Sequence, residues 1–434
     1  MSNHFPNNRA QDNQVQSNRA NDQDGLAQSD PTVHGSSAPG RLRELAFFFL
    51  RLGTTAFGGP AAHIAIMEDE LVRRRKWLSR EKFLDLLGAS NLIPGPSSSE
   101  LAIHIGYLRA GWMGLVVGGM CFILPAALLV ACIAWAYVRF GHLPAVAGLL
   151  YGVKPVVIAV ILQALWGLGR TAIKSKLLVA VCIFCVILSF LGVNALAILA
   201  GTGLVVAIGH AVSRRRGVKF GTRPKALALL WHNFGLKTSQ LLVLAAGAAT
   251  AAVPGMWALF RVFLKIGSVV FGSGYVLLAF LRADLVMHRG WVTDAQLVDA
   301  VAIGQVTPGP VFTTATFLGY LLRGPVGAVV ATVGIFLPAF VLVAISGPLI
   351  PRIRKSATAA AFLDGINVAS LAIMAAVSYQ LARSAIVDWW TAGLAIMGAI
   401  LLLCFRISSA WLVLGGALIG VAAQFVRGAV LWLL

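Results

Sequence analysis

The sequence has little charge. Asp, Glu, Lys and Arg together make up 12% of its 434 residues, whereas a typical soluble domain carries about 25%. Hydrophobic residues make up 58%, and they form repeated apolar runs of about 20 residues, which is the length of a helix that spans a bilayer. A soluble globular fold is therefore excluded. We predict an all-α polytopic membrane protein whose surroundings are the lipid bilayer.

Acidic residues are the scarcer of the two charge types, with 16 Asp and Glu against 35 Lys and Arg and a net charge of +19. The basic residues cluster between the apolar runs, as they do in cytoplasmic loops. No basic face with interleaved aromatic residues lies outside these runs, so we expect no nucleic-acid partner.

Groups for metal, redox or phosphate chemistry are also scarce. The five cysteines all lie in apolar runs, and Cys182 and Cys185 form a C-x-x-C without a second pair. We interpret them as packing residues, with a metal or redox role as the alternative. His63 and His104 lack metal-ligand spacing, and residues 235–238 lack the Gly-Lys of a phosphate loop. We therefore expect no cofactor or metal, no enzyme, and transport that does not use ATP.

The chain divides into four parts. Its polar start has no apolar region typical of a signal peptide, so we expect a disordered cytoplasmic tail. The parts are the tail at 1–43, a first repeat at 44–211, a basic loop with a linking transmembrane helix at 212–258, and a second repeat at 259–434.

The two repeats are visible by alignment of the chain with itself. Identical residues recur 214 positions later, and 213 positions later once one residue has dropped out. The pairs are Phe57 and Phe271, Trp77 and Trp291, Asp85 and Asp299, Pro94 and Pro308, and, at 213, Pro125 and Pro338. Such a long register indicates duplication.

Loop charge predicts that the repeats have inverted topology. Residues 67–82 contain six Lys or Arg, whereas the matching 281–296 contain two. The later pair reverses this bias, since the basic loop at 351–356 matches a loop with only Arg139. Equivalent loops then lie on opposite sides of the membrane. With re-entrant or broken segments in each half, about nine full spans and four broken segments result.

Each repeat contains two breaks in its apolar segments. A Pro-Gly-Pro break lies within 91–100 and again within 305–314, and glycine-rich breaks lie at 57–60 and 271–274. Broken backbone survives at membrane depth only where it is buried in protein or lines a wet cavity. A helix that starts there offers N–H groups and a positive dipole end to an anion, while Ser and Thr of its first turn can cap it or donate to an oxyanion. The alternative is a kinked helix without a ligand.

Charged residues inside the apolar runs are further candidates. Arg51 and Lys265 each lie six residues before a glycine-rich break, at one repeat position. Such cations are functional candidates, or they snorkel to headgroups. Lys154 is a third candidate and is matched by Asn367. Glu100 is interpreted either as a proton site or as a carboxylate that stabilises a helix N-terminus.

The candidate substrate-binding residues share a place at or near these breaks. They are Arg51, Phe57, Gly58, Gly59, Asn91, Pro94, Gly95, Pro96, Ser97, Ser98, Glu100, Lys154, Lys265, Phe271, Gly272, Ser273, Gln305, Pro308, Gly309, Pro310 and Thr313.

The breaks carry a resemblance to a known family. The motifs Phe57-Gly58-Gly59-Pro60 and Pro94-Gly95-Pro96, with their second-half counterparts at 271–272 and 308–310, resemble those of the chromate ion transporter family over residues 44–431. The resemblance implies a multi-pass protein of the bacterial plasma membrane that exports chromate, with sulfate as a competing analogue. Residues 272–274 depart from the Gly-Gly-Pro of the first half, and Glu100 has no acidic counterpart.

Other functions stay open at this point. Export by membrane potential or a proton gradient is the main hypothesis, and a sulfate or other oxyanion transporter of the same build is the first alternative. An anion channel and a membrane-embedded enzyme are further alternatives, although an enzyme would need a nucleophile and base or a metal cluster at the breaks. Association of two chains as a homodimer also stays open.

Overall fold

A computed structural model describes residues 38–57, 59–141, 143–215, 254–271, 276–346, 356–405 and 407–433, and these contain helices and no strand. The first repeat comprises α2 (Ala38–Thr55), α3 (Gly59–Met67), the π-helical η2 (Glu68–Arg74), α4 (Arg80–Ser90), α5 (Ser97–Phe140), α6 (Pro144–Ala172), α7 (Lys176–Phe190) and α8 (Ala195–Arg215). The second comprises α10 (Met256–Val269), α11 (Leu277–Leu281), η4 (Arg282–His288), α12 (Asp294–Val306), η5 (Val311–Thr313), α13 (Thr314–Ser346), α15 (Ala357–Ala385), α16 (Trp389–Leu403) and α17 (Ser409–Leu433).

The duplication predicted from the sequence is confirmed by the element boundaries. The π-helical turn Glu68–Arg74 recurs 214 residues later as Arg282–His288. Helix Pro144–Ala172 recurs 213 residues later as Ala357–Ala385, with the same length of 29 residues. Because even a π-helical turn is repeated, the two halves share local geometry as well as helix order.

The boundary of the tail needs one correction. Helix α2 begins at Ala38 and not at residue 44, so residues 38–43 belong to the first helix. Pro39 in its first turn costs no intrahelical hydrogen bond, and the following Arg-Leu-Arg-Glu are good helix formers. The rest of the expected tail, and most of the linking helix expected within 212–258, lie outside the described residues.

Helices α5 and α13 are each folded into a tight hairpin. The backbone turns at Ala110 and Gly111, and again at Arg323 and Gly324, where the two glycines have φ angles of 61° and 64°. Only glycine adopts this conformation at little cost. The arms 97–109 and 112–140 run back along each other so closely that a side chain on Gly106 would collide with the backbone of the opposite arm. The predicted re-entrant segments are thus short arms of helical hairpins.

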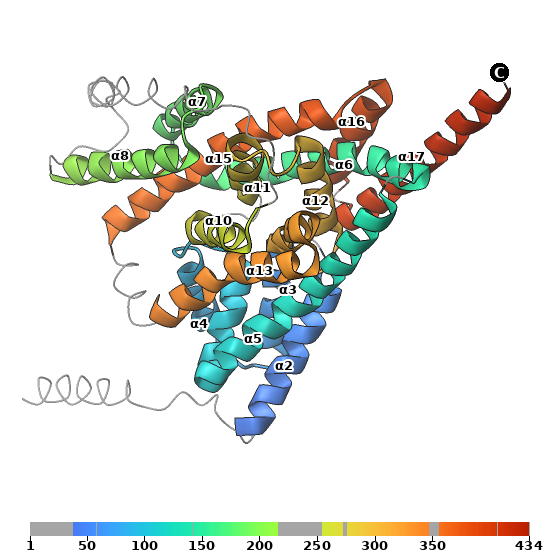
Figure 1. Cartoon of the computed structure of the whole chain (residues 1–434). Coiled ribbons are helices and arrows are strands. Elements are labelled where there is room, and N and C mark those ends of the chain that lie inside the picture. The colour runs from blue at the N-terminus through green and yellow to red at the C-terminus, as the bar shows by residue number, and fades with distance from the viewer. Residues whose placement is uncertain are drawn as a thin grey trace, which may run out of the picture.

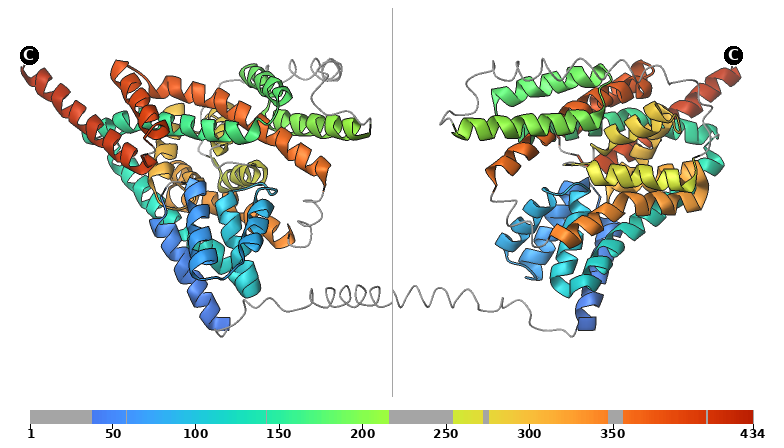
Figure 2. Two further views of the ribbon diagram at one scale, coloured as in Figure 1. Left: turned by 180° about the vertical axis from the view of Figure 1, so that it is seen from behind. Right: turned by 60° about the vertical axis from the view of Figure 1, so that its left-hand side comes forward.

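The two repeats are interlocked. Helices α6 and α15 pack against each other, and each also packs against the last two helices of the other repeat: α16 and α17 lie on α6, and α7 and α8 lie on α15. In Figure 1, helices α7, α8, α15 and α16 lie in the upper part of the molecule and α2 to α4 in the lower part, while the long arm of α5 runs from the lower part up toward α17. Figure 2 shows the same separation from two other directions. Such reciprocal contacts are what an approximate two-fold axis between the repeats produces; their inverted orientation in a bilayer stays a prediction.

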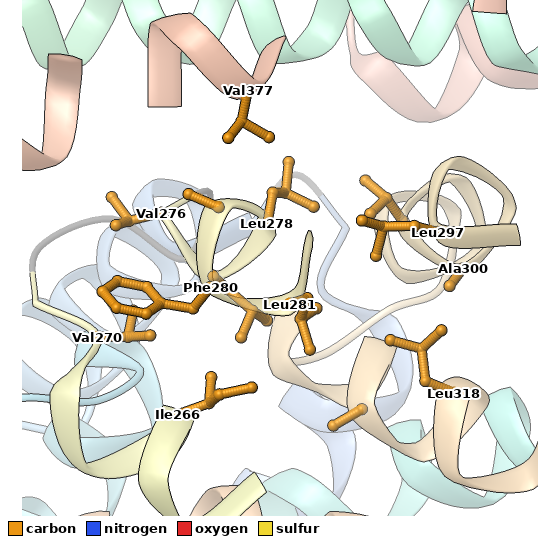
Figure 3. Packing of buried hydrophobic residues seen from close by; sticks show 14 of the residues in the cluster. Ile266, Val270, Val276, Leu278, Phe280, Leu281, Leu297, Ala300, Leu318 and Val377 are labelled. Atoms are coloured by element: carbon orange, nitrogen blue, oxygen red, sulfur yellow. The ribbon is translucent and has the colours of Figure 1, made fainter. Parts of the chain in front are cut away.

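The largest apolar cluster surrounds the short helix α11. Leu278, Phe280 and Leu281 of this helix are buried, and residues of α10, α12, α13 and α15 enclose them. In Figure 3, Val377 of α15 lies above α11, while Ile266 of α10 lies below it. This core fixes the second repeat's broken segment, because the dense packing of side chains resists its displacement.

Five helical segments among the described residues are long and apolar enough to cross a membrane. They are Ser97–Phe140, Val146–Ala172, Ala195–Ser213, Val311–Ser346 and Ala357–Ala385, and three shorter apolar helices accompany them. The chain is therefore a polytopic all-α membrane protein of two repeats with broken and re-entrant helices.

Candidate functional site

The two Pro-Gly-Pro breaks are each bound to the other repeat by a backbone hydrogen bond. The N–H of Gly95 donates to the carbonyl of Val270, with an N–O distance of 2.7 Å. The N–H of Gly309 donates to the carbonyl of Ala56, at 3.0 Å. Ala56 and Val270 immediately precede the two glycine-rich breaks, so each Pro-Gly-Pro break is held next to the start of the other repeat's glycine-rich break.

Both central glycines adopt backbone conformations that other residues rarely take. The φ angle is +143° at Gly95 and +91° at Gly309. A Cβ on Gly309 would lie 2.6 Å from the Cβ of Ala126 and 3.1 Å from the carbonyl oxygen of Gly53. A side chain is therefore excluded at this break both by strain and by the first repeat packed against it.

A buried helix N-terminus follows the first break. Pro96 occupies the N-cap position of α5 without a side-chain cap, and its carbonyl accepts hydrogen bonds from the N–H groups of Ser99 and Glu100. Ser97 and Ser98 are buried in the first turn. The serines thus do not act as N-caps. The positive dipole end points at the break, where it favours an anion.

The second break is similar in its backbone but not in its hydroxyls. The N–H of Thr313 donates to the carbonyl of Pro310 at 3.0 Å. The hydroxyl of Thr313 donates to the same carbonyl at 2.8 Å, and the hydroxyl of Thr314 donates to the carbonyl of Val311 at 2.8 Å. The protons of both hydroxyls are engaged by the chain itself, so an anion in this conformation would depend on backbone donors.

Glu100 is the least satisfied polar residue at the first break. Its side chain is 0% exposed, and neither carboxyl oxygen has a hydrogen-bond partner among the described residues. The carboxyl folds back over Gly95, where it would collide with any added side chain. His104 lies one helical turn further along α5, and its buried Nε2 has no partner in the described part of the chain. A buried polar group without a partner is costly and needs an explanation.

Lys154 lies in an ion pair between the repeats. Its Nζ is 3.2 Å from Oδ1 of Asp299, and the hydroxyl of Tyr137 donates to Oδ2 at 2.9 Å. Asp299 belongs to α12 of the second repeat, whereas Lys154 on α6 and Tyr137 on α5 belong to the first. The Asp299 side chain is only 4% exposed. The charge of Lys154 is therefore balanced by the protein itself.

The two cations at one repeat position differ in their surroundings. Lys265 donates to both carboxylate oxygens of Asp284 at 3.0 Å, and its side chain is 43% exposed. Arg51 is exposed on α2, and the described residues contain no ion pair of its side chain. Glu70, the counterpart of Asp284, instead pairs with Arg75 at 2.9 Å. The two cations thus share a repeat position but not their surroundings, and their part in anion binding stays a prediction.

The other candidates divide by exposure. Phe57 and Asn91 are exposed, Gly59 is buried and Phe271 is partly buried. Those at the Pro-Gly-Pro breaks, including Gln305, Pro308 and Pro310, are buried, apart from the partly buried Pro94. Gly58, Gly272 and Ser273 lie outside the described residues.

Sequence reasoning overlooked the acidic partners of the two lysines. Asp299 sits in the apolar run Leu297–Val301, and an ionisable residue in such a run signals function or a buried pair. The sequence showed that Asp299 matches Asp85 in the repeat register, but only the folded structure shows that Asp299 lies next to Lys154. Within the described ranges, His, Cys, Asp and Glu form no group of three or more that could hold a metal ion.

Taken together, the contacts between the repeats involve the two Pro-Gly-Pro breaks, the helix N-termini that follow them, and one buried carboxyl without a hydrogen-bond partner among the described residues. This arrangement can bind a small anion through backbone N–H groups and helix dipoles, since both ends present positive partial charge.

Comparison with known proteins relates the chain to one family. The family model described as "Chromate transporter" matches residues 43–207 and again residues 257–421. The chain is 34% identical to a chromate transport protein of Cupriavidus metallidurans over 91% of this chain and 97% of the relative. It is 32% identical to a chromate transport protein of Pseudomonas aeruginosa over 82% and 84% of the two chains. A probable chromate transport protein of Synechococcus elongatus is 31% identical over 84% and 90%. No solved structure matches the chain.

Proposed function

Because the chain belongs to the chromate transporter family, we propose that it exports chromate from the cytoplasm across the bacterial plasma membrane as a secondary transporter. The relatives named for chromate transport cover most of its length, and both repeats match the family. The proposal adds a direction of transport, a membrane and an energy source to this membership.

The observation that carries the proposal is the paired placement of the two Pro-Gly-Pro breaks. Each break begins a buried helix, and each donates a backbone hydrogen bond to the opposite repeat. A tetrahedral dianion held between two positive helix ends gains from both dipoles. Since the same interface joins the repeats, movement of one repeat against the other would expose the site to either side of the membrane in turn.

The membrane potential favours the proposed direction. One elementary charge that crosses 100 mV changes in free energy by about 2.3 kcal/mol, so a dianion that leaves a negative-inside cell gains about 4.6 kcal/mol. At about 1.4 kcal/mol per tenfold, this supports a gradient of roughly three decades. Export thus needs no ATP, although a proton gradient is a further possible energy source.

Sulfate is the competing substrate, since it is also a tetrahedral dianion. A helix-terminus site recognises charge and oxygen geometry, which the two ions share. We therefore expect sulfate to inhibit chromate transport.

The test is chromate uptake by inverted membrane vesicles with an imposed potential, positive inside. We expect saturable uptake that increases with the potential and falls when sulfate is added. Lys174→Ala serves as a matched control, because Lys174 forms an exposed ion pair with Asp364 away from the breaks. Uptake no greater than in vesicles without the protein would refute the proposal, and uptake that never saturates would favour a channel.

A further inference from the structure

We propose that Glu100 is a proton-binding site and that the anion binds to the form of the protein in which this carboxyl carries a proton. The inference rests on the proposed function, since it names the group whose protonation controls binding of the transported anion at the same site. Four observations support it: the burial of the carboxyl, its position at the first break, the absence of a compensating charge, and the contrast with the second repeat.

The burial of Glu100 decides its protonation in this conformation. Its side chain is 0% exposed, and both oxygens lack hydrogen-bond partners among the described residues. An ionised carboxylate in such a place would lose its hydration without any replacement, and in practice such a group takes up a proton. In this conformation Glu100 is therefore the neutral acid.

The position of the carboxyl links the proton to the anion. Glu100 lies in the first turn of α5, and its carboxyl folds back over Gly95 of the break. The ionised carboxylate would place its own negative charge at the positive end of α5, where an anion is expected to bind. Two negative charges at the same helix end repel each other, so protonation of the carboxyl makes the site available to the anion.

Among the described residues, no charged group on the elements packed against α5 pairs with Glu100. Glu44 of α2 pairs with Arg109 at 3.2 Å, and Asp299 of α12 pairs with Lys154. His63 of α3 contacts the carbonyl of Ala56 at 3.1 Å through Nε2.

The remaining charged groups on the neighbouring elements form no hydrogen bond to either oxygen of Glu100, and this includes Arg41 and Arg43 of α2. Arg51 of α2 and Asp85 of α4 are exposed, as are Arg80, Glu81 and Lys82 of α4. Arg323 of α13 donates to the carbonyl of Pro254 at 2.6 Å. The ion pairs of the described residues therefore leave Glu100 uncompensated.

His104 is the nearest titratable group on the same helical face. It follows Glu100 by four residues, so the two side chains lie one turn apart on α5. Its buried Nε2 has no partner in the described part of the chain. An imidazole one turn away can pass a proton to or from the carboxyl, which gives Glu100 a neighbour for proton exchange along the helix.

The second repeat has no equivalent acid. Thr314 occupies the position that matches Glu100, and its hydroxyl donates to the carbonyl of Val311. Both N-termini thus share a backbone design, but only the first carries an ionisable group. A purely structural role in helix initiation would not require this difference.

The experiment measures chromate binding to the purified full-length protein at a series of pH values above neutrality. Proton uptake is followed with an indicator dye in weak buffer. For wild type we expect no linked proton uptake while the free protein still carries the Glu100 proton. At higher pH, where the free protein has lost it, we expect one proton taken up per anion bound and an affinity that falls by about tenfold per pH unit. Glu100→Gln should bind chromate with no linked proton uptake and a flat profile.

Two controls attribute the linked proton to the carboxyl of Glu100. Glu44→Gln makes the same change at an exposed ion pair and should keep the wild-type slope. Protonation of chromate itself is common to all variants, so the difference between Glu100→Gln and wild type belongs to the protein.

The outcomes separate the two proposals. Suppose that wild type binds chromate but, at every pH of the series, takes up no proton beyond that seen with Glu100→Gln. The inference is then overturned, while the proposed function stands. The wild-type dye signal alone decides this even when Glu100→Gln fails to fold. Glu100→Asp keeps an acid at this position and should therefore show the linked proton uptake. If wild type binds no chromate at all, the proposed function fails and takes this inference with it.

Discussion

The two repeats have nearly the same backbone but different charge chemistry. The breaks at Gly95 and Gly309 donate equivalent hydrogen bonds across the interface, and the hairpin turns at Gly111 and Gly324 have φ angles within a few degrees of each other. The side chains around them differ: the first break is followed by the uncompensated Glu100, and the second by hydroxyls that bond to their own turn.

The acidic residues show the same divergence. In the second repeat, Asp284 and Asp299 pair with lysines at 3.0 and 3.2 Å. Their first-repeat counterparts lie nearer solvent, with Glu70 paired to Arg75 and Asp85 exposed. The comparison indicates that the two repeats share the backbone geometry of the breaks, whereas the ionisable side chains around the breaks differ between them. Four predictions test this division, in order of expected effect.

The largest effect is expected at the buried ion pair. Asp299→Ala should destabilise the protein by about 3–5 kcal/mol, because it leaves the charge of Lys154 without its partner inside the protein. Asp85→Ala, the same change at the exposed repeat counterpart, should cost about 0.5 kcal/mol or less. Thermal unfolding in detergent compares the two. Equal shifts would mean that the repeats are not electrostatically distinct.

The next effect concerns the glycines of the breaks. Gly309→Ala should destabilise by about 1–3 kcal/mol through backbone strain, with a further cost from the contact at 2.6 Å with Ala126. Gly95→Ala should cost less, because its nearest neighbour is the end of the flexible Glu100 side chain. Monodispersity and thermal unfolding measure both. A greater loss with Gly95→Ala would contradict the packing described for the two breaks.

A third prediction addresses the helix ends. Replacing Pro94 and Pro96 together by Ala should let α4 and α5 join and pair the N–H groups internally. Chromate affinity should then fall by up to about 2 kcal/mol, the upper range for a helix dipole, or roughly thirtyfold. Ser97→Ala should cost less, since backbone donors remain. Binding assays on purified protein decide, and unchanged affinity in the double variant would make the breaks purely structural.

The smallest effect on stability is expected at Arg51 and Lys265. Lys265→Ala should destabilise by about 1 kcal/mol or less, because its pair with Asp284 is partly exposed. Arg51→Ala should leave stability unchanged. If both cations hold the anion, as their shared repeat position predicts, both variants lose transport equally. A loss with Arg51→Ala alone would instead show that Asp284 has taken Lys265 away from the anion.

Much of the fold could be predicted from the sequence, for identifiable reasons. Apolar run length located α6 and α15, and the offset of 214 residues aligned every break with its partner. The glycines at which the hairpins turn, Gly111 and Gly324, were not singled out, although Ala110-Gly111 and Arg323-Gly324 stand at the repeat offset of 213. A glycine in an apolar helix is common in membranes, so only the backbone shows which ones reverse the chain.

The candidate site was predictable in its backbone and less so in its charges. Proline fixes local geometry wherever it stands, so Pro94, Pro96, Pro308 and Pro310 predicted broken helices correctly. The acidic partners of Lys154 and Lys265 could not be predicted from the sequence, because ion pairs between helices join residues that are far apart in the chain.

The sequence by itself determined the membrane class, the duplication and the positions of the breaks, since run length, register and proline act locally. The tertiary structure alone decided which groups meet. The N–H of Gly95 reaches Val270 and that of Gly309 reaches Ala56, Asp299 neutralises Lys154, and Glu100 has no hydrogen-bond partner within the described ranges. The physical reason is that pairing and desolvation depend on the surroundings of a side chain in space, which interlocking of the two repeats creates.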